Sequence, residues 1–166
     1  MKTLIELLAA GNGSSTCLSA ANSAPLTYSA LRQLSQYVQS AFNQAGIGRN
    51  DRVALVLPNS AEMAASFVTV ACCCTSAPLN PSYRADEFEF YLNDLNAKAL
   101  VVEKGSSSPA VAVAAKMGIA LIELEPTPTL GAGSFTLNMH GLAAKAAQHP
   151  GDAQPCLLYT SPSPRD

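Results

Sequence analysis

The spacing of hydrophobic residues predicts a series of helices and strands. Residues 29–48 have an apolar face at helical spacing, formed by Leu31, Leu34, Val38, Ala41, Phe42 and Ala45. Residues 53–57 are continuously apolar, as in a strand that is covered on both sides of a sheet. Residues 61–77 are apolar nearly all round, which predicts a buried helix, and Asn59 and Glu62 have the spacing of its N-cap and N3 positions.

The alternation continues through the next part of the chain. Residues 77–83 predict a short extended segment and a turn. Residues 84–96 predict a helix with one apolar face, formed by Phe88, Tyr91, Leu92 and Leu95. A strand (97–103), a helix of small residues (108–118) and a further strand (119–125) are predicted to follow. Strands that alternate with helices indicate an α/β fold with a mostly parallel sheet and helices on both faces.

The two ends of the chain carry other patterns. Residues 1–11 predict an amphipathic helix that ends at Gly11, and residues 16–28 predict a β-hairpin. Beyond the last predicted strand the periodicity fades. Residues 126–139 are typical of a loop, and residues 140–149 predict a short helix. We therefore expect an N-terminal helix and a hairpin in front of a partial sheet.

The composition is rich in residues that form a hydrophobic core and poor in the charged residues that cover a surface. The chain is 48% hydrophobic and only 13% charged, against about 25% charged residues in a typical soluble domain. This balance suits a piece of a larger protein whose remaining part would cover it. The net charge of −2 and the lack of basic runs disfavour nucleic acid as a partner. No apolar run approaches the roughly 20 residues that span a membrane. The odd count of five cysteines argues against a secreted disulfide scaffold and favours the cytoplasm.

Several short motifs suggest binding sites, and each has a simpler structural interpretation. Cys72, Cys73 and Cys74 suggest a metal site. Adjacent helical residues point about 100° apart, however, and three in a row cannot converge on one ion. We therefore expect them to be small buried apolar side chains. GNGSST at 11–16 and GAGS at 131–134 lack the lysine and the spacing of a phosphate loop and predict flexible turns.

The titratable residues form no catalytic constellation. His140 and His149 have no neighbouring cysteine and predict surface or capping roles. The acidic residues of the helix at 84–96 predict its solvated face: Asp86, Glu87, Glu89 and Asp94. The residues alone therefore predict no catalytic, cofactor-binding or metal-binding side chain. They leave open a stand-alone α/β module that binds a nucleotide or another protein.

Four motifs occur in series: LTYSAL at 26–31, PN at 58–59, PLNPSY at 78–83 and EFEFYL at 87–92. Their order and spacing resemble the opening region of the adenylate-forming acyl-CoA synthetases, the AMP-dependent synthetase and ligase family. The resemblance covers roughly residues 1–150. Within the family, the sequence APLNPSYRADEFEFYL at 77–92 is most similar to the oxalate–CoA ligase branch.

The resemblance implies a ligase that works in two steps. A carboxylate attacks ATP to give an acyl-adenylate and pyrophosphate, and the thiol of coenzyme A then displaces AMP. The family's phosphate loop, Thr-Glu pair, ribose-binding Asp and mobile lysine are all missing here. Residues 1–155 would thus be a truncated N-terminal part of the AMP-binding domain, inactive alone and binding no cofactor. ATP, Mg²⁺, coenzyme A and a small carboxylate are implied for the full-length parent, which would be cytoplasmic or peroxisomal.

The last segment, CLLYTSPSPRD at 156–166, has a different interpretation. Its LLYTS resembles the start of the family's phosphate loop, which would make Thr160 and Ser161 phosphate-binding residues. A phosphate loop needs glycine next, so that backbone N–H groups can approach the phosphates, whereas Pro162 and Pro164 have no N–H to offer. The whole segment instead resembles a translated sequencing-library adapter. We expect it to be foreign to the protein.

Overall fold

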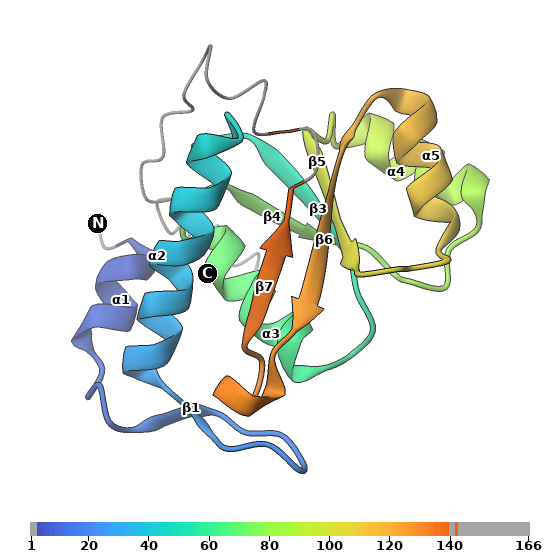
Figure 1. Ribbon diagram of the computed structural model, residues 1–166. Helices are drawn as coiled ribbons and strands as arrows, with labels where there is room; N and C mark the ends of the chain where they lie inside the picture. Colours follow the sequence, from blue (N-terminus) through green and yellow to red (C-terminus); the bar gives the residue numbers. More distant parts are fainter. Residues whose placement is uncertain (1–2, 140–141, 143–166) are drawn as a thin grey trace, which may run out of the picture.

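A computed structural model of the protein describes residues 3–139 and 142 (Figure 1). In chain order the elements are α1 (Leu4–Ala10), β1 (Thr16–Leu18), β2 (Leu26–Thr27), α2 (Tyr28–Gln44), β3 (Arg52–Val56), α3 (Ala61–Ala71), β4 (Thr75–Pro78), α4 (Ala85–Asp94), β5 (Ala99–Glu103), α5 (Pro109–Met117), β6 (Ala120–Pro126), the 3₁₀ helix η1 (Pro128–Leu130) and β7 (Phe135–Asn138). The helix predicted at 140–149 and the segment 156–166 lie outside the described residues.

The central sheet has five strands in the order β4-β3-β5-β6-β7. β3 pairs in parallel with both β4 and β5, and β5 pairs in parallel with β6. β7 runs antiparallel to β6 at the edge of the sheet. β1 and β2 form a separate antiparallel hairpin, and α1 precedes it. The structure thus confirms the mostly parallel sheet, the N-terminal helix and the hairpin.

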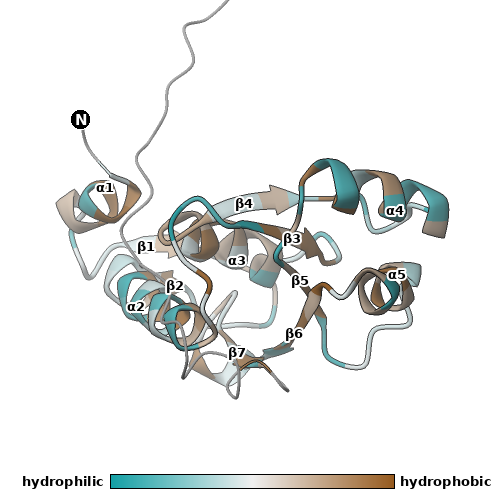
Figure 2. Cartoon of the chain, turned by 90° about the horizontal axis from the view of Figure 1, so that it is seen from above, coloured by the Kyte–Doolittle hydropathy of each residue, from teal (hydrophilic) through white to brown (hydrophobic). Residues whose placement is uncertain are grey.

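Helices cover both faces of the sheet, as predicted. Figure 2, which views the chain from above, shows α1, α2 and α3 on one side of the strands and α4 and α5 on the other. Successive side chains of a strand point to opposite faces. Val53 and Leu55 of β3 therefore join the core that contains α2 and α3, whereas Ala54 and Val56 join the core that contains α4 and α5. This double burial explains why residues 53–57 are continuously apolar.

The boundaries of α3 differ from the prediction at both ends. Its N-cap is Ser60 rather than Asn59, because the Ser60 hydroxyl accepts a hydrogen bond from the Met63 backbone N–H at 3.2 Å. The helix ends at Ala71, so the three cysteines that follow lie in a turn. β4 begins directly after the cysteines and pairs with β3. The Thr75 backbone N–H donates to the Asp51 carbonyl, just before β3.

α3 is buried on one side only, although its sequence is apolar nearly all round. Ala65 and Val70 are buried in the core, whereas Phe67 is 43% exposed. A helix without a polar face is typical of a position that is covered on all sides. The prediction of a buried helix therefore holds for the sheet-facing side, while the described residues leave the Phe67 side open.

The prediction of a loop over residues 126–139 is wrong in part, because this segment contains η1 and the strand β7. Its partner β6 provides the pairing, with Leu124 opposite Leu137 and Pro126 opposite Phe135. On the other side of β7, the Leu137 backbone N–H donates to the Tyr37 hydroxyl of α2 at 3.0 Å. An outward N–H that is occupied by a side chain is less available to a further strand. Tyr37 therefore blocks this edge of the sheet.

Replacing Tyr37 by phenylalanine should expose the β7 edge. The variant keeps the ring but loses the hydroxyl, so we expect the free energy of unfolding to fall by about 0.5–1.5 kcal/mol. Hydrogen exchange followed by NMR provides the local measurement. The Leu137 amide should exchange faster in Tyr37→Phe, while the amide of Val101, in the central strand β5, serves as the internal reference. An unchanged Leu137 rate relative to Val101 would contradict the blocking role.

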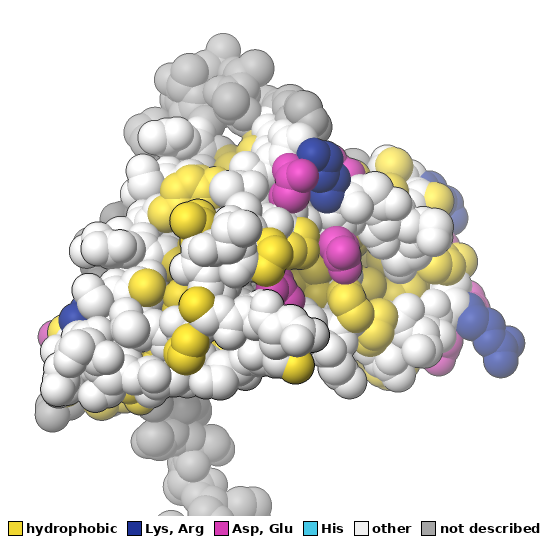
Figure 3. Space-filling model, turned by 60° about the horizontal axis from the view of Figure 1, so that its bottom comes forward, with side chains coloured by type: hydrophobic (Ala, Val, Ile, Leu, Met, Phe, Trp, Pro, Cys, Tyr) yellow, Lys and Arg dark blue, Asp and Glu magenta, His cyan; other side chains and the backbone are white. Residues whose placement is uncertain are grey.

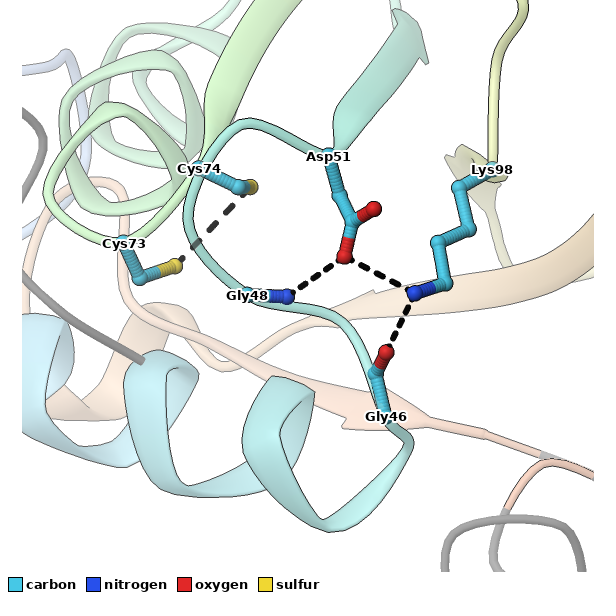
Figure 4. A network of polar contacts seen from close by, with 6 residues as sticks. All are labelled: Gly46, Gly48, Asp51, Cys73, Cys74 and Lys98. Carbon is cyan, nitrogen blue, oxygen red and sulfur yellow. Dashed lines mark hydrogen bonds and ion pairs between the residues drawn. The ribbon is translucent and has the colours of Figure 1, made fainter. Parts of the chain in front are cut away.

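A polar cluster fixes the amino ends of the central strands (Figure 4). The Asp51 carboxylate accepts hydrogen bonds from the Gly48 backbone N–H and from the Lys98 ammonium, both at 2.8 Å. Lys98 also donates to the Gly46 carbonyl. The Lys98 side chain is 45% exposed, so the ion pair itself contributes only about 0–1 kcal/mol. The main effect of the cluster is to hold the turn after α2 against the start of β5.

Candidate functional site

The strand order creates a crevice at the carboxyl ends of β3 and β5. From β3 the chain passes through α3 to β4 on one side, and then returns through α4 to β5 on the other side of β3. The loops that leave β3 and β5 lead to helices on opposite faces of the sheet. In open α/β sheets, ligands bind outside the carboxyl ends of the strands at such a reversal of the strand order.

A pocket of about 400 Å³ lies at this reversal. Val56 and Pro58 at the end of β3, Pro81 after β4 and residues 103–108 after β5 form its walls. The volume lies within the range of about 300–1,000 Å³ that small-molecule sites occupy. Three segments that are distant in sequence therefore meet at the place where the topology favours a binding site.

Residues 103–108 supply most of the polar groups of this pocket. Gly105 has a φ of 72°, a conformation that glycine adopts without strain. The Ser106 hydroxyl oxygen accepts from the Ser108 backbone N–H at 3.2 Å, and the Ser108 hydroxyl oxygen accepts from the Ala110 backbone N–H at 3.3 Å. The second bond caps α5. The loop thus holds its hydroxyl groups in place through the start of a helix.

Lys104 brings a positive charge to the same loop, and a carboxylate already holds it. Its ammonium donates to Glu125 at 2.8 Å, and this hydrogen bond raises the pKa of Lys104, with smaller contributions from the charges of Glu125 and Glu123. The pocket therefore offers serine hydroxyls and a paired cation, whereas the backbone N–H groups of Lys104, Gly105, Ser106 and Ser108 already donate within the protein. Such a wall suits a small polar molecule better than a multiply charged phosphate, which would have to displace the carboxylate.

The described residues form no metal centre. Across residues 3–139 and 142, no three His, Cys, Asp or Glu side chains come together in a metal-binding arrangement. His140 and His149, which we expect to have surface or capping roles, lie outside the described residues. The same part of the chain contains no helix with the length and apolarity that crossing a membrane requires.

The cysteine run is buried, as expected, but not on a helix. Cys72, Cys73 and Cys74 have 0% exposure and lie in the turn between α3 and β4. Cys72 still has helical backbone angles, and the backbone N–H groups of Cys72 and Cys74 donate to the carbonyls four residues earlier, so the turn continues the geometry of α3. The Sγ atoms of Cys73 and Cys74 lie 4.0 Å apart.

The GAGS segment at 131–134 forms a packed turn rather than a flexible one. Ala132 and Ser134 are 1% and 7% exposed, and both glycines have positive φ. A Cβ atom on Gly133 would stand 2.6 Å from the Ala61 carbonyl oxygen at the start of α3. The glycines are needed for close packing against α3, and this turn does not line the pocket at the strand reversal.

Two further candidates have structural roles. The GNGSST segment at 11–16 forms the turn before β1 and the first residue of β1, and the Gly13 carbonyl accepts from the Ser29 backbone N–H at 2.9 Å. The acidic residues of α4 are exposed, as expected for a solvated face. Glu87 among them accepts a hydrogen bond from the Arg84 backbone N–H at 2.8 Å, which satisfies the N-cap amide of α4.

The residues that carry the family resemblance mostly set turns and helix starts. Thr27 caps α2, because its hydroxyl accepts from the Ala30 backbone N–H at 3.2 Å. The Asn80 carboxamide accepts from the Ser82 backbone N–H at 3.0 Å and fixes the turn between β4 and α4. Pro58 lies in the pocket wall. Pro81 of the PLNPSY motif lines the same pocket. These two prolines connect the motifs directly with the pocket, and the sequence does not single out residues 103–108.

An open α/β sheet with a polar pocket at its strand reversal is typical of proteins that bind small molecules. The chain belongs to the AMP-binding enzyme family, whose sequence pattern it matches over residues 6–163. It is 37% identical over 145 residues to an oxalate–CoA ligase of Arabidopsis thaliana, an alignment that covers 82% of this chain and 27% of that protein. It is 34% identical over 110 residues to an oxalate–CoA ligase of Saccharomyces cerevisiae, which covers 60% of this chain and 20% of that protein.

The fold agrees with solved structures of similar proteins. The crystal structure of apo MatB from Rhodopseudomonas palustris superposes with a TM-score of 0.66 at 21% identity, over 84% of this chain and 30% of that chain. The family that the motifs indicate and the α/β fold are thus confirmed. The chain spans less than a third of the length of each of these proteins.

Proposed function

We propose that residues 1–155 are the N-terminal part of the AMP-binding domain of an ATP-dependent carboxylate–CoA ligase. The observation that carries the proposal is the 37% identity to an oxalate–CoA ligase over most of this chain. In the proposed reaction, a carboxylate oxygen attacks the α-phosphorus of ATP and pyrophosphate leaves. The coenzyme A thiol then attacks the acyl carbon and releases AMP. The mixed anhydride makes this second step feasible, because a carboxylate itself is a poor electrophile.

The described residues do not fit the phosphate and Mg²⁺ part of this chemistry. Lys104 is paired with Glu125, and no acidic cluster of metal-binding geometry occurs within residues 3–139 and 142. ATP, Mg²⁺ and coenzyme A are therefore assigned to the full-length parent, and the present chain is a scaffold without a catalytic residue. The substrate class that we favour for the parent is a small carboxylate such as oxalate, in a cytoplasmic or peroxisomal enzyme.

ATP–pyrophosphate exchange tests this proposal directly. We expect the 166-residue chain to show no oxalate-dependent exchange, and a longer protein translated from the genomic sequence past codon 155 to show it. Malonate and benzoate serve as comparison substrates. Carboxylate-dependent exchange by the short chain would overturn its inactivity. A long protein that activates no carboxylate would overturn the ligase assignment.

A stand-alone binding module is the second candidate, and the pocket at the strand reversal favours it. The exposed large apolar side chains weigh against it, because Leu130, Phe90 and Phe67 are 72%, 64% and 43% exposed. Figure 3 shows several hydrophobic patches on one face of the molecule, with few charged side chains between them. Sedimentation of the purified chain separates the two candidates. A complete module should remain monomeric, whereas part of a larger domain should self-associate through its apolar surface.

We also infer that residues 156–166 are foreign to the protein. The Ser-Pro-Ser-Pro sequence is incompatible with a phosphate loop, and the whole segment resembles a translated adapter. The family match extends into this segment as far as residue 163. Sequencing the genomic DNA past codon 155 decides whether residues 156–166 are foreign or belong to the family domain. A natural continuation into a Ser/Thr/Gly-rich loop with a lysine is expected, and genomic codons for SPSPRD would contradict the inference.

A further inference from the structure

Three aromatic side chains form a contiguous cluster on the outside of α4. Tyr83 stacks on Tyr91 with ring centroids 5.0 Å apart and ring planes 13° from parallel, and Phe90 meets Tyr91 edge to face at 5.2 Å. Phe90 and Tyr91 are 64% and 36% exposed. Figure 2 shows α4 at the outside of the molecule, on the side of the sheet opposite α2. We call these three residues the α4 aromatic cluster.

Phe90 lies at the centre of the face of α4 that points away from the core. Phe88 and Leu92, two positions to either side of it, are the buried residues of this helix. With 3.6 residues per turn, a position two residues away lies on nearly the opposite side of a helix. Polar residues are typical opposite the core face of an amphipathic helix. The Phe90 ring therefore lies outside the core that Phe88 and Leu92 help to form.

Carboxylates flank the exposed rings. Asp86 and Asp94 lie one turn before and one turn after Phe90, and Glu87 lies one turn before Tyr91. Residues four apart on a helix are neighbours on its surface. Among the described residues, neither Asp86 nor Asp94 takes part in an ion pair. The outer face of α4 thus combines aromatic rings with carboxylates that have no cationic partner there.

The basic residues near α4 do not neutralise this face. Lys116 of α5 binds Glu89 at 2.8 Å, so Glu89 is already paired and is not part of the surface that we describe. Residues 80–96 contain four acidic side chains and one basic one, Arg84, so this stretch carries −3, whereas the whole chain carries −2. The negative charge of the chain is therefore concentrated around the α4 aromatic cluster.

We propose that the α4 aromatic cluster and its flanking carboxylates form a docking surface for an arginine-containing segment of a partner protein. A guanidinium is attracted to the face of an aromatic ring and stacks on it, and the same planar group pairs with a carboxylate through two parallel N–H groups. The surface offers both kinds of group within one helical turn. Its residues do not line the pocket at the strand reversal, and the proposal does not rest on the proposed ligase activity.

Charge favours this occupant over an apolar one. A purely apolar partner would bury Asp86 and Asp94 without a counter-ion, which is costly. Two copies of the chain that met through this face would oppose like charges. Phe67 of α3 is the contrasting case, since the residues one turn away from it carry no charge: Met63, Ala64, Val70 and Ala71. The face around Phe90 therefore suits a cation, whereas the face around Phe67 suits an apolar neighbour.

Amide chemical shifts measured by NMR locate the binding. The probe is a peptide of alternating glycine and arginine with blocked ends, added to the folded chain at low ionic strength, because salt screens exposed charges. We expect the amides of residues 83–94 to shift. The same peptide with lysine in place of arginine should bind more weakly, because an ammonium is a compact point charge without a planar face. A glutamate peptide should leave these amides unshifted.

Substitutions of exposed phenylalanines separate stacking from apolar contact. Phe90→Ala should raise the Kd of the arginine peptide roughly two- to fivefold, which is the loss expected for one exposed contact between a cation and a ring. Phe90→Leu keeps an apolar side chain but removes the ring, so the Kd should rise by the same factor. Phe67→Ala, the matched control on the opposite side of the sheet, should leave the Kd unchanged.

A second pair of variants tests the carboxylates. Asp94→Asn should raise the Kd roughly two- to fivefold. Glu89→Gln removes the same charge from the side chain that Lys116 already binds, so its effect should be smaller. All the substituted side chains are exposed, so the variants should fold, and circular dichroism checks this.

Several results would overturn the proposal. These are unshifted amides at residues 83–94, equal affinity for the lysine and arginine peptides, wild-type affinity of Phe90→Leu, a loss of affinity in Phe67→Ala, and equal effects of Asp94→Asn and Glu89→Gln. Sedimentation tests the remaining occupant. If Phe90→Ala abolished self-association of a chain that binds no arginine peptide, the surface would belong to a second copy.

Discussion

Replacing Phe88 by alanine is expected to lower the free energy of unfolding by about 3–5 kcal/mol. Phe88 is 0% exposed, and its ring meets Tyr83 edge to face at a centroid distance of 5.8 Å. It belongs to the core that contains α4 and α5. Because the free energy of unfolding of a typical domain is only about 5–15 kcal/mol, the variant should remain folded with little stability to spare. Urea unfolding followed by circular dichroism measures the loss.

Phe90 provides a matched control on the same helix. It lies two positions further along α4 and is 64% exposed. Phe90→Ala removes the same side chain without leaving a cavity, so the free energy of unfolding should change by no more than about 0.5 kcal/mol. Equal losses for the two variants would mean that α4 presents a different face to the sheet.

Gly133→Ala is expected to have the second large effect. The φ of 76° places an alanine in the left-handed region, at a cost of roughly 1–2 kcal/mol. The new methyl group would also stand 2.6 Å from the Ala61 carbonyl oxygen and 2.7 Å from a Leu18 methyl carbon. Overpacking of this kind typically costs a further 1–3 kcal/mol or so. The sum should appear as a lower midpoint of urea unfolding.

Gly118→Ala separates the contact from the backbone effect. Gly118 has a φ of 68°, close to that of Gly133, but a Cβ atom there would meet nothing within 4 Å. Only the backbone strain of roughly 1–2 kcal/mol should remain. The difference between the two variants measures how tightly the turn at 131–134 packs against α3. Identical losses would contradict the packed turn.

The order of the elements could be predicted because the local signals agree with the tertiary structure. The apolar run of β3 reflects burial on two faces, and the single apolar face of α4 reflects burial on one. The N-cap of α3 was misplaced by one residue, since both Asn59 and Ser60 are good capping residues and only the backbone geometry selects between them. Local chemistry thus determines which element forms, and its exact boundary depends on three-dimensional context.

The pocket could not be predicted from the sequence, and the edge strand was indicated only in part. Phe135 and Leu137 alternate with Thr136 and Asn138, which is the pattern of a strand, but this short segment does not show that its partner is β6. The pocket depends on the order of the strands, since Pro58 and Gly105 are neighbours only when β3 lies beside β5. The approach of Cys73 to Cys74 likewise depends on the turn that ends α3. These features arise from pairing and chain direction, which periodicity does not encode.

The position of the pocket has a consequence for how such a protein can evolve. The strands beneath it are buried on both faces, so their residues are constrained by packing. The lining residues belong to loops, and Ser107 is exposed. Exposed substitutions usually change stability by no more than about 0.5 kcal/mol. Mutations in residues 103–108 can therefore alter what the pocket accepts while the sheet remains unchanged, so that ligand preference can drift between lineages without a compensating change in the core.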